Sequence, residues 1–410
     1  MFENLVNQEA GKFIRADIRH NRLPGAVLFA GAEASGKLTA ALETARILSC
    51  HQPRQGEWLC ECPSCLQHKS LTCTNLMLMG PRDCSLEIAA AAKTFNEAYF
   101  VNAKYIDAAR YLFLRSVRKL TLRFNGILWE GDSNLNKIGS VIEEINENLE
   151  QLDFPHELPG VNEVKGICEE ISKLCSKLEN EYLYDSIPVN QVRNMETWAH
   201  MKSEEGRKTV IIENADRMQE SVRNALLKIL EEPPRDVVFI LLTSKRNAIM
   251  QTILSRVRTY NFVSRTTEQQ KDVIERVFHN MDFTGNLNDY LLTYLPVTPS
   301  EIKTQARAFY NSIANRQISN CNIEEIVKKC EKFYPRIELR LFLSDIANFM
   351  RPLMNSQAGS EAAAKAMQLL RNCNENITLY NQPPVSALEI LLRDMFALNN
   401  QFGGVFCAAM

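Results

Sequence analysis

The stretch Val27-Leu-Phe-Ala-Gly-Ala-Glu-Ala-Ser-Gly-Lys-Leu38 joins an apolar run to a loop that contains Gly31 and Gly36 and ends in Lys37. An apolar strand, a glycine-rich loop and a following helix cradle phosphate groups, because backbone N–H groups and the helix N-terminus converge on the phosphate oxygens. Lys37 would reach the outer phosphates. The stretch therefore predicts a phosphate-binding loop at the end of a buried strand.

The segments around this loop alternate between strand-like and helix-like patterns. The expected strands are Ala26–Ala30, Asn75–Met79, Thr209–Ile212 and Val237–Thr243, and the expected helices are Gln8–Arg19, Lys37–Leu48, Ser221–Leu230 and Ile249–Arg256. Such alternation indicates a mostly parallel sheet with helices on both faces. The predicted fold class of this part of the chain is α/β.

Two positions depart from what a magnesium-dependent NTPase needs. The residue after the loop lysine should be Ser or Thr, whose hydroxyl binds Mg²⁺, but it is Leu38, and Thr39 should point about 100° away around the helix. The later apolar strand should end in Asp-Glu, but Glu213-Asn214 follows it, and an amide is no base near neutral pH. We expect the loop to hold ATP or ADP weakly, without efficient hydrolysis. The candidate nucleotide-binding residues are Gly31, Ser35, Gly36, Lys37, Leu38, Thr39, Glu213 and Thr243.

Four of the 12 cysteines gather in one short segment, in the pattern Cys50-x9-Cys60-x-Cys62-x2-Cys65. Four thiolates at close spacing suit tetrahedral Zn²⁺, and clustering of this kind in a reducing compartment is typical of metal binding rather than of disulfides. The Cys60-x-Cys62 spacing is tighter than usual, and His51 and His68 are possible substitutes. The sequence predicts a structural zinc site.

The chain has 410 residues, 47 Lys+Arg against 49 Asp+Glu, and a formal net charge of −2. This length suggests two to four domains, and the near-neutral balance provides no overall basic field for nucleic acid. The longest apolar run, around Val237–Leu242, is too short to span a bilayer, and the first residues lack a signal-sequence pattern. We expect a cytoplasmic protein without membrane partners.

The segment from Arg82 to Asp185 lacks strand-like alternation and is expected to be helical. Its second half should form a helical hairpin that turns at Phe154–Gly160. Residues 126–186 carry 14 acidic and 4 basic side chains, and the preceding helix carries Arg110, Arg115, Arg118, Lys119 and Arg123. The favoured interpretation is that the basic helix and acidic hairpin are solvated faces that can pair with one another. Direct contact of the basic helix with DNA is the alternative.

After Tyr260 the chain is expected to be helical to its end. A small helical unit should cover about 266–311 and a larger one about 318–399. The tail from Gln401 to Met410 is expected to be loose.

Several motifs, taken together and in this order, resemble the clamp-loader subunits of bacterial DNA polymerase III, which are AAA+ proteins. They are Leu23-Pro24, the phosphate loop, the cysteine segment, Asn224-Ala-Leu-Leu-Lys-Ile-Leu-Glu-Glu-Pro-Pro234 and Thr252-Ile-Leu-Ser-Arg256. The resemblance covers about residues 1–80 and 186–265, and returns weakly at Asn381–Leu392. It implies an AAA+ P-loop domain followed by helical domains.

This family contains two kinds of subunit that the chain could match. The gamma/tau subunit is an ATPase motor, with Ser or Thr after the loop lysine and Asp-Glu on the acidic strand. The delta-prime subunit is a non-hydrolysing stator with a degraded nucleotide site. Leu38, Glu213 and Asn214 favour the delta-prime type. An active gamma/tau-type ATPase that uses Lys37 with Thr39 or Glu213 in unusual roles remains the alternative.

The resemblance also implies a role for Ser255-Arg256. Arg256 would act in trans as an arginine finger in the ATP site of a neighbouring motor subunit, and such a residue is worth about 10³–10⁵ in rate. Thr243 and Ser244 would occupy the sensor position at a strand end. The implied partners are the gamma/tau and delta subunits, the sliding clamp, and primed DNA through the complex. The chain would belong to a polymerase holoenzyme without polymerising DNA itself.

The expected domains are an AAA+ domain at 1–265, a small helical lid at 266–311 and a helical collar for oligomerisation at 312–410. The AAA+ domain would include a zinc module at 50–65 and a helical insertion at about 82–185. A third interpretation, a free-standing zinc-stabilised nucleotide sensor, would not need the collar.

Overall fold

The computed structural model describes residues 1–409 except 53–55, 204–205, 335, 379 and 381. The chain divides into two compact units, Met1–Leu291 and Leu292–Met410. The first unit contains a sheet with helices on both faces, and the described part of the second unit is helical. The weak resemblance at Asn381–Leu392 begins at a residue outside the described part of the chain.

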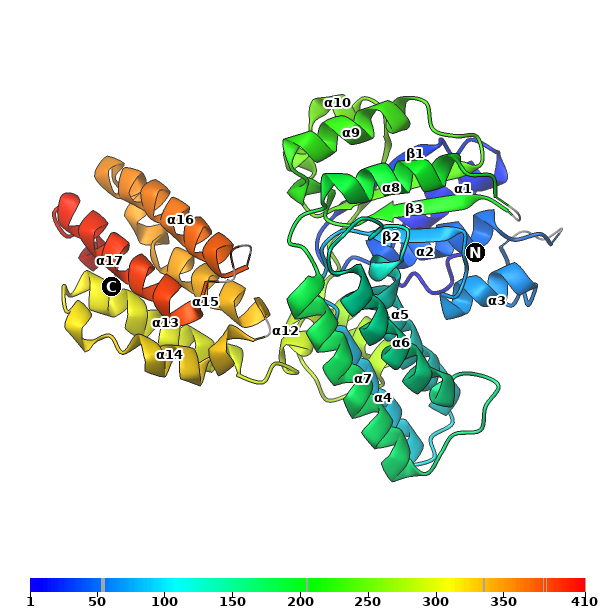
Figure 1. The fold of residues 1–410 in the computed structure, drawn as a ribbon, viewed down its shortest axis with the longest axis horizontal. Coiled ribbons are helices and arrows are strands. Elements are labelled where there is room, and N and C mark those ends of the chain that lie inside the picture. Colours follow the sequence, from blue (N-terminus) through cyan, green and yellow to red (C-terminus); the bar gives the residue numbers. More distant parts are fainter. Residues whose placement is uncertain (53–55, 204–205, 335, 379, 381, 410) are drawn as a thin grey trace. The chain divides into compact units, whose positions relative to one another are not determined.

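Five strands form one sheet in the order β2-β3-β4-β1-β5 (Figure 1). Their bounds are Ala26–Gly31 for β1, Leu76–Met79 for β2, Lys208–Ile212 for β3, Val237–Thr243 for β4 and Arg258–Phe262 for β5. Every neighbouring pair is parallel. The predicted α/β fold with a parallel sheet is therefore confirmed.

Alternate residues of each strand face opposite sides of the sheet, and two apolar cores result. Val27 and Phe29 of β1 belong to the core that holds α1 (Ala10–Arg19) and α2 (Lys37–Leu48). Leu28 belongs to the opposite core, which is covered by other helices. Those helices are α4 (Ser85–Phe100), α5 (Ile106–Thr121), α6 (Leu135–Leu152), α7 (Val161–Tyr182), α8 (Val189–His200) and α9 (Glu220–Glu231).

The strand order brings the candidate residues to one edge of the sheet. The loop after β1 lies between the carboxyl ends of β4 and β5, because β1 pairs with both. Thr243 ends β4, and Glu213 follows β3, the next strand in the sheet. Ligand sites of parallel α/β sheets form at this edge, outside the carboxyl ends of the strands.

The strand β5 corrects the expectation that the chain is helical from Tyr260 onward. This short strand is an edge strand with β1 as its sheet neighbour. Tyr260 and Phe262 are buried while Asn261 between them is exposed, so the segment does alternate. Its pattern is only five residues long, which is too short to distinguish from a helix start by periodicity alone.

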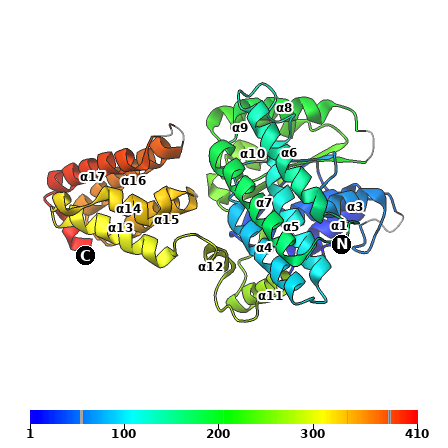
Figure 2. The same cartoon turned by 60° about the horizontal axis from the view of Figure 1, so that its bottom comes forward.

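Helices α4 to α7 run side by side as a helical arm that extends from the sheet (Figures 1 and 2). The 3₁₀ turn η1 (Leu122–Phe124) continues α5, and α6 and α7 form the predicted hairpin. Their apolar stripes join the same core as the sheet, through residues such as Ile145 and Ile171. The arm is therefore packed as part of the first unit.

The basic side chains of α5 and η1 point into the protein rather than forming a solvated face. Arg110 donates to the backbone oxygens of Leu152, Asp153 and His156 at the hairpin turn, at 2.6–2.7 Å. Arg118 pairs with the Asp153 carboxylate at the same turn. The interpretation that the basic helix pairs with the hairpin is correct at the turn. The acidic hairpin does present a solvated face, with Glu143, Glu147 and Glu150 exposed, but the basic helix does not.

The remaining helices of the first unit are short. They are α3 (Pro63–Ser70), α10 (Gln251–Leu254), α11 (Thr267–Phe278) and α12 (Leu287–Leu292), of which α12 ends at the boundary of the two units. The second unit contains α13 (Pro299–Ala314), α14 (Ile323–Lys329), α15 (Arg336–Phe349), α16 (Gln357–Thr378) and α17 (Pro384–Gln401). Among the described residues, no helix combines the length and the apolar character needed to cross a bilayer.

In the described part of the chain, the C-terminal tail packs through Phe406 against the rest of the second unit, which corrects the expectation of a loose tail there. Phe406 is fully buried and stacks on Tyr310 at 6.1 Å between ring centroids. The buried Asn399 side chain accepts from the Phe406 N–H at 3.0 Å. The proposed lid at 266–311 and collar at 312–410 stay a prediction.

Arg110 offers a test of how the arm is held together. Replacing Arg110 by Ala leaves one buried and two partly buried backbone oxygens without their charged donor, and it removes a guanidinium that lies 4.1 Å from the centre of the Phe154 ring. We expect Arg110→Ala to lower the free energy of unfolding by about 2–4 kcal/mol, measured by urea unfolding. The exposed Arg193 of α8 provides a matched control. Arg193→Ala should cost less than about 0.5 kcal/mol, and equal effects of the two variants would contradict the assigned role of Arg110.

Candidate functional site

The phosphate loop has the backbone that its sequence predicts. Gly31 lies against β5 so closely that a Cβ there would meet the Phe262 carbonyl oxygen at 2.0 Å. Gly36 precedes α2 with φ of 89°, in the left-handed region that favours glycine. The Ser35 hydroxyl closes the loop by donating to the Ala32 oxygen at 2.7 Å. These contacts fix the loop at the N-terminus of α2, where an anion is stabilised.

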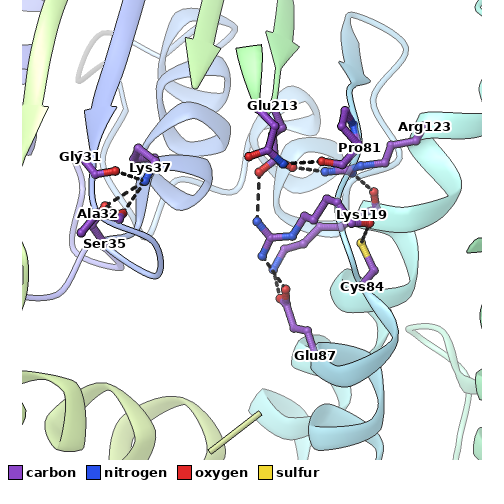
Figure 3. A network of polar contacts seen from close by, with 12 residues as sticks. Gly31, Ala32, Ser35, Lys37, Pro81, Cys84, Glu87, Lys119, Arg123 and Glu213 are labelled. Carbon is purple, nitrogen blue, oxygen red and sulfur yellow. Dashed lines mark hydrogen bonds and ion pairs between the residues drawn. The ribbon is translucent and has the colours of Figure 1, made fainter. Parts of the chain in front are cut away.

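Lys37 is folded back onto the loop (Figure 3). Its ammonium group donates to the carbonyl oxygens of Gly31 at 2.7 Å and of Ala32 at 2.5 Å. Burial lowers the pKa of Lys37 to about 8, although the carboxylates of Glu213 and Glu33 oppose this shift. Lys37 therefore keeps its positive charge at neutral pH and can exchange its carbonyl partners for phosphate oxygens.

The position that should bind Mg²⁺ belongs to the apolar core. Leu38 is buried and packs with residues such as Val27 and Phe29 under the sheet. A side chain in this environment offers no oxygen to a metal. Thr39 is the adjacent, half-buried residue of α2.

Glu213, at the end of β3, is held by two arginines. One carboxylate oxygen accepts from Arg82 at 3.0 Å, and the other accepts from Arg123. The Glu213 and Arg123 side chains are 7% and 1% exposed, so this is a buried ion pair (Figure 3). A carboxylate whose two oxygens both accept from guanidinium groups is a poorer ligand for Mg²⁺ and a poorer base, because the two cations draw on the charge that either task needs.

The same arginines extend this arrangement into a chain of charges. Arg82 also donates to Glu87 of α4 at 2.8 Å, and Glu87 pairs in turn with Lys119 of α5. Although burial opposes the charge of both groups, the carboxylates of Glu213 and Glu87 raise the pKa of Arg82, and Lys119 and Arg82 hold the pKa of Glu87 well below its usual range. Arg82 and Glu87 are therefore charged at neutral pH.

The residues after Glu213 and at the end of β4 are engaged within the fold. Asn214 has left-handed backbone angles and its side-chain amide donates to the Pro81 oxygen. The Thr243 hydroxyl donates to Asp216 at 2.7 Å and accepts from the Lys245 N–H at 2.9 Å. Thr243 thus lies near the loop, as expected of a strand-end position, and it links β4 to Asp216.

A polar cavity of about 370 Å³ opens beside the phosphate loop. Its lining includes Ala32, Glu33 and Ala34 of the loop, together with Arg265. Arg265 ties the loop to the N-terminal segment by donating to the oxygens of Ala34 and Val6. The cavity provides space for a ligand that the loop holds at one end.

The four predicted metal ligands converge. The sulfur atoms of Cys50, Cys60, Cys62 and Cys65 all lie within 4.8 Å of one another. Four thiolates around tetrahedral Zn²⁺, each at about 2.3 Å from the metal, would lie about 3.8 Å apart. The described cysteines therefore fit a four-thiolate metal site. The suggested substitutes do not join this cluster, because His68 is buried beside Cys73 and His51 is exposed.

Arg46 links the cysteine cluster to the phosphate loop's helix. This buried residue of α2 donates to the Cys65 sulfur at 3.2 Å and binds Glu43 through two nitrogens. Burial and the neighbouring thiols raise the pKa of Cys65, so a metal ion would have to displace its proton. The Arg46 guanidinium would then balance part of the negative charge of the thiolates.

The predicted arginine finger forms contacts away from the loop. Arg256 follows α10 and pairs with Glu231 at the end of α9. It also donates to the Thr252 oxygen at 2.6 Å, and Ser255 beside it is exposed. The Arg256 side chain is 29% exposed in this pair, so it can be turned outward at the cost of one partly solvated ion pair.

The sequence analysis missed Arg82 and Glu87 as members of the site, and it did not connect Arg123 to Glu213. Arg123 precedes Glu213 by 90 residues and Arg82 precedes it by 131. No local pattern marks such pairs. The signal in the sequence was the excess of basic residues in the helix before the acidic hairpin. The partners of these basic residues depend on the fold.

The sequence matches the family described as "DNA polymerase III, delta subunit" over residues 6–123 and 147–266. It is 35% identical over 86 residues to a DNA polymerase III subunit delta' of Buchnera aphidicola, a region that spans 21% of this chain and 26% of that protein. It is 38% identical over 76 residues to the subunit of the same name from Haemophilus influenzae, across 18% of this chain and 23% of that protein. The chain thus matches about a quarter of the length of these curated relatives.

A solved structure of a DNA polymerase III gamma subunit-related protein from Thermotoga maritima overlaps 56% of this chain and 90% of its own. The TM-score is 0.26 and the sequence identity 16%. A TM-score this low carries no argument about the fold.

The pKa of Lys37 provides a direct test of the geometry of the loop. Because burial disfavours the charged form, we expect the Lys37 amine to lose its proton near pH 8, whereas an ordinary lysine titrates at about 10.4. Acylation of Lys37, followed by mass spectrometry across a pH series, should show a midpoint near pH 8.

A matched variant tests the cause of this shift. Glu213→Gln removes a carboxylate that supports the charge of Lys37, so the midpoint should move to lower pH. A midpoint above pH 10 in the unaltered protein would mean that Lys37 is solvated rather than held by the loop.

Proposed function

The chain belongs to the family described as DNA polymerase III, delta subunit, and we propose that it acts as a delta-prime-type clamp-loader subunit. In this role it is a stator of the DNA polymerase III holoenzyme that hydrolyses no ATP itself. It helps other subunits to load the sliding clamp on primed DNA. The delta-prime names of the relatives support this choice within the family.

The observation that carries this proposal is the occupation of Glu213 by Arg82 and Arg123. Hydrolysis by a P-loop ATPase requires a metal ion held near the acidic strand and a residue that orients the attacking water. Both oxygens of Glu213 are engaged by arginines, which weakens the carboxylate for either task, and Leu38 supplies no hydroxyl. A gamma/tau-type ATPase, the alternative, would have to break a buried ion pair before it could use Glu213.

The loop itself is proposed to hold ATP or ADP weakly. Gly31, Ser35 and Gly36 set its backbone, Lys37 provides the cation, and the adjacent cavity accommodates the remainder of a nucleotide. Thr243 lies at the neighbouring strand end. A nucleotide bound here would stabilise the fold of the subunit and would not supply energy through hydrolysis.

Arg256 is proposed to act on a neighbouring subunit. Its position after α10, with Ser255 exposed beside it, suits a residue that is presented to a partner. In the assembled ring Arg256 would leave Glu231 and stabilise the charge that develops on the phosphate transferred in the neighbour's ATP site. The partners of this assembly are the gamma/tau and delta subunits, the sliding clamp, and primed DNA through the complex.

The assembly is proposed to work in the bacterial cytoplasm. The collar at 312–410 would serve oligomerisation, and 266–311 would form a small helical lid. Phe406 is buried and packs within the proposed collar. The helical content of the second unit supports a collar, and a free-standing sensor would not need one.

Zinc is the metal proposed for Cys50, Cys60, Cys62 and Cys65. Thiolates favour Zn²⁺, and four of them leave no open position for catalysis. Its role is structural, because the ion would join the turn before α3 to the end of α2.

The first test of the function is Mg²⁺-dependent ATP hydrolysis by the purified chain, alone and mixed with motor and delta subunits, clamp and primed DNA. We expect no hydrolysis by the chain alone and hydrolysis in the mixture. Arg256→Ala should reduce ATP turnover in the neighbouring site that Arg256 serves by about 10³-fold or more. Steady hydrolysis by the chain alone, abolished by Lys37→Ala, would favour the motor alternative.

Two further variants separate the finger from folding. The ion pair of Arg256 with Glu231 is partly exposed, so its loss should cost at most about 1 kcal/mol of stability. Arg246→Ala removes another exposed arginine near Arg256 in the sequence and should leave turnover unchanged. Glu231→Gln frees Arg256 and should preserve turnover. Normal turnover with Arg256→Ala would remove the finger from the proposal.

The metal is tested by elemental analysis of freshly purified, reduced protein. We expect about one zinc per chain, and loss of most of it in Cys65→Ser, because a four-ligand site needs every thiolate. Cys407→Ser is the control, since Cys407 is an exposed cysteine outside the cluster. Chelation should also lower Tm. Zinc far below one per chain in the unaltered protein would refute the site.

A further inference from the structure

The acidic end of β3 is occupied by cations of the protein itself. From α5 to β3 the charges alternate in the order Lys119, Glu87, Arg82, Glu213, Arg123. This row of charged side chains contains three cations and two anions, and Lys37 of the phosphate loop lies beside it (Figure 3). A P-loop site that uses Mg²⁺ has the opposite character, because free carboxylates there attract the metal.

The two arginines that bind Glu213 differ in how far their side chains are exposed to solvent. The Arg123 side chain is 1% exposed and also donates to the Lys119 oxygen, so it is fixed within the arm. The Arg82 side chain is 31% exposed and bridges Glu213 and Glu87. Arg82 also lies close enough to Lys37 to lower its pKa. Arg82 is thus the arginine whose exposed part can face an anion in the loop while both arginines still hold Glu213.

Magnesium does not fit the residues at this place. Leu38 is buried in the core, both oxygens of Glu213 accept from guanidinium groups, and one oxygen of Asp216 accepts from Thr243. Mg²⁺ requires near-octahedral oxygen ligands. A divalent cation placed here would also be repelled by Arg82 and Arg123, and each unit of like charge at 4 Å costs about 1 kcal/mol even in water.

We propose that the loop binds the polyphosphate of a nucleotide without magnesium, with Lys37 and Arg82 in place of the metal ion. The inference rests on the proposed nucleotide binding by the loop and specifies its ligand as the metal-free nucleotide anion. Guanidinium groups bind phosphate oxygens in bidentate geometry, and a lysine ammonium binds them as a point charge. Binding of this kind neutralises the phosphates without assembling a centre for hydrolysis.

The test measures binding of ATP to the full chain by calorimetry, once in EDTA and once in excess Mg²⁺ at matched ionic strength. We expect Mg²⁺ to weaken binding by about fivefold or more, which corresponds to one like-charge contact. Stronger binding in Mg²⁺ would overturn the inference. Absence of binding in both conditions would overturn both the inference and the proposed nucleotide role of the loop.

Variants of Arg82 identify its contribution. Arg82→Gln should weaken binding in EDTA by about fivefold or more and reduce the difference between EDTA and Mg²⁺. Arg82→Lys keeps a cation and should retain the preference for EDTA, which guards against a variant that merely misfolds. Arg193→Gln removes an exposed arginine of α8 and should change nothing. If Arg82→Gln binds ATP as the unaltered protein does in both conditions, Arg82 is not part of the site.

A different measurement tests the proposal that the protein is a stator. Its test is turnover of the assembled complex with Arg256→Ala, which does not depend on Lys37 or Arg82. A chain that binds no ATP can still serve as a stator, and a chain whose Arg256 proves dispensable can still bind metal-free ATP.

Discussion

The buried carboxylate of Glu213 constrains the rest of the first unit. A charge at the end of a central strand is tolerated only with partners, and removing one partner of a buried pair commonly costs about 3–5 kcal/mol. Arg82 and Arg123 are those partners, and they come from the segments before α4 and after α5. By holding Glu213 they also anchor both segments to the sheet. One ion cluster therefore occupies the acidic end of β3 and fixes where the helical arm meets the sheet.

The arm is consequently a structural part of the site rather than a surface addition. Helix α5 reaches three regions: its arginines contact the hairpin turn at Asp153, the end of α3 at Ser70, and Glu213 through Arg123 in the following turn. The family match includes residues up to 123 and resumes at 147, so the arginines on Glu213 lie within the matched part. Residues 124–146, which include the first part of α6, lie outside it.

The cysteine cluster and the phosphate loop share helix α2. Lys37 begins this helix, and Arg46 near its end donates to Cys65. The buried pair of Arg46 with Glu43 also accounts for two charges within an apolar helix. A metal ion at the cysteines would thus stabilise the same helix whose N-terminus carries the proposed anion site, which would give the proposed metal a structural purpose within the first unit.

The sequence by itself determined the strand-loop-helix around Lys37, four of the five strands, the α6–α7 hairpin and the cysteine cluster. Each of these is a local pattern of periodicity or spacing, and local patterns survive in any fold that buries their apolar face. It also identified Leu38 and Asn214 as departures from an ATPase. The edge strand β5, the packed tail at Phe406 and the arginines on Glu213 were decided by tertiary structure. Burial and ion pairing between residues far apart in the chain depend on which surfaces meet, and a local pattern does not specify that.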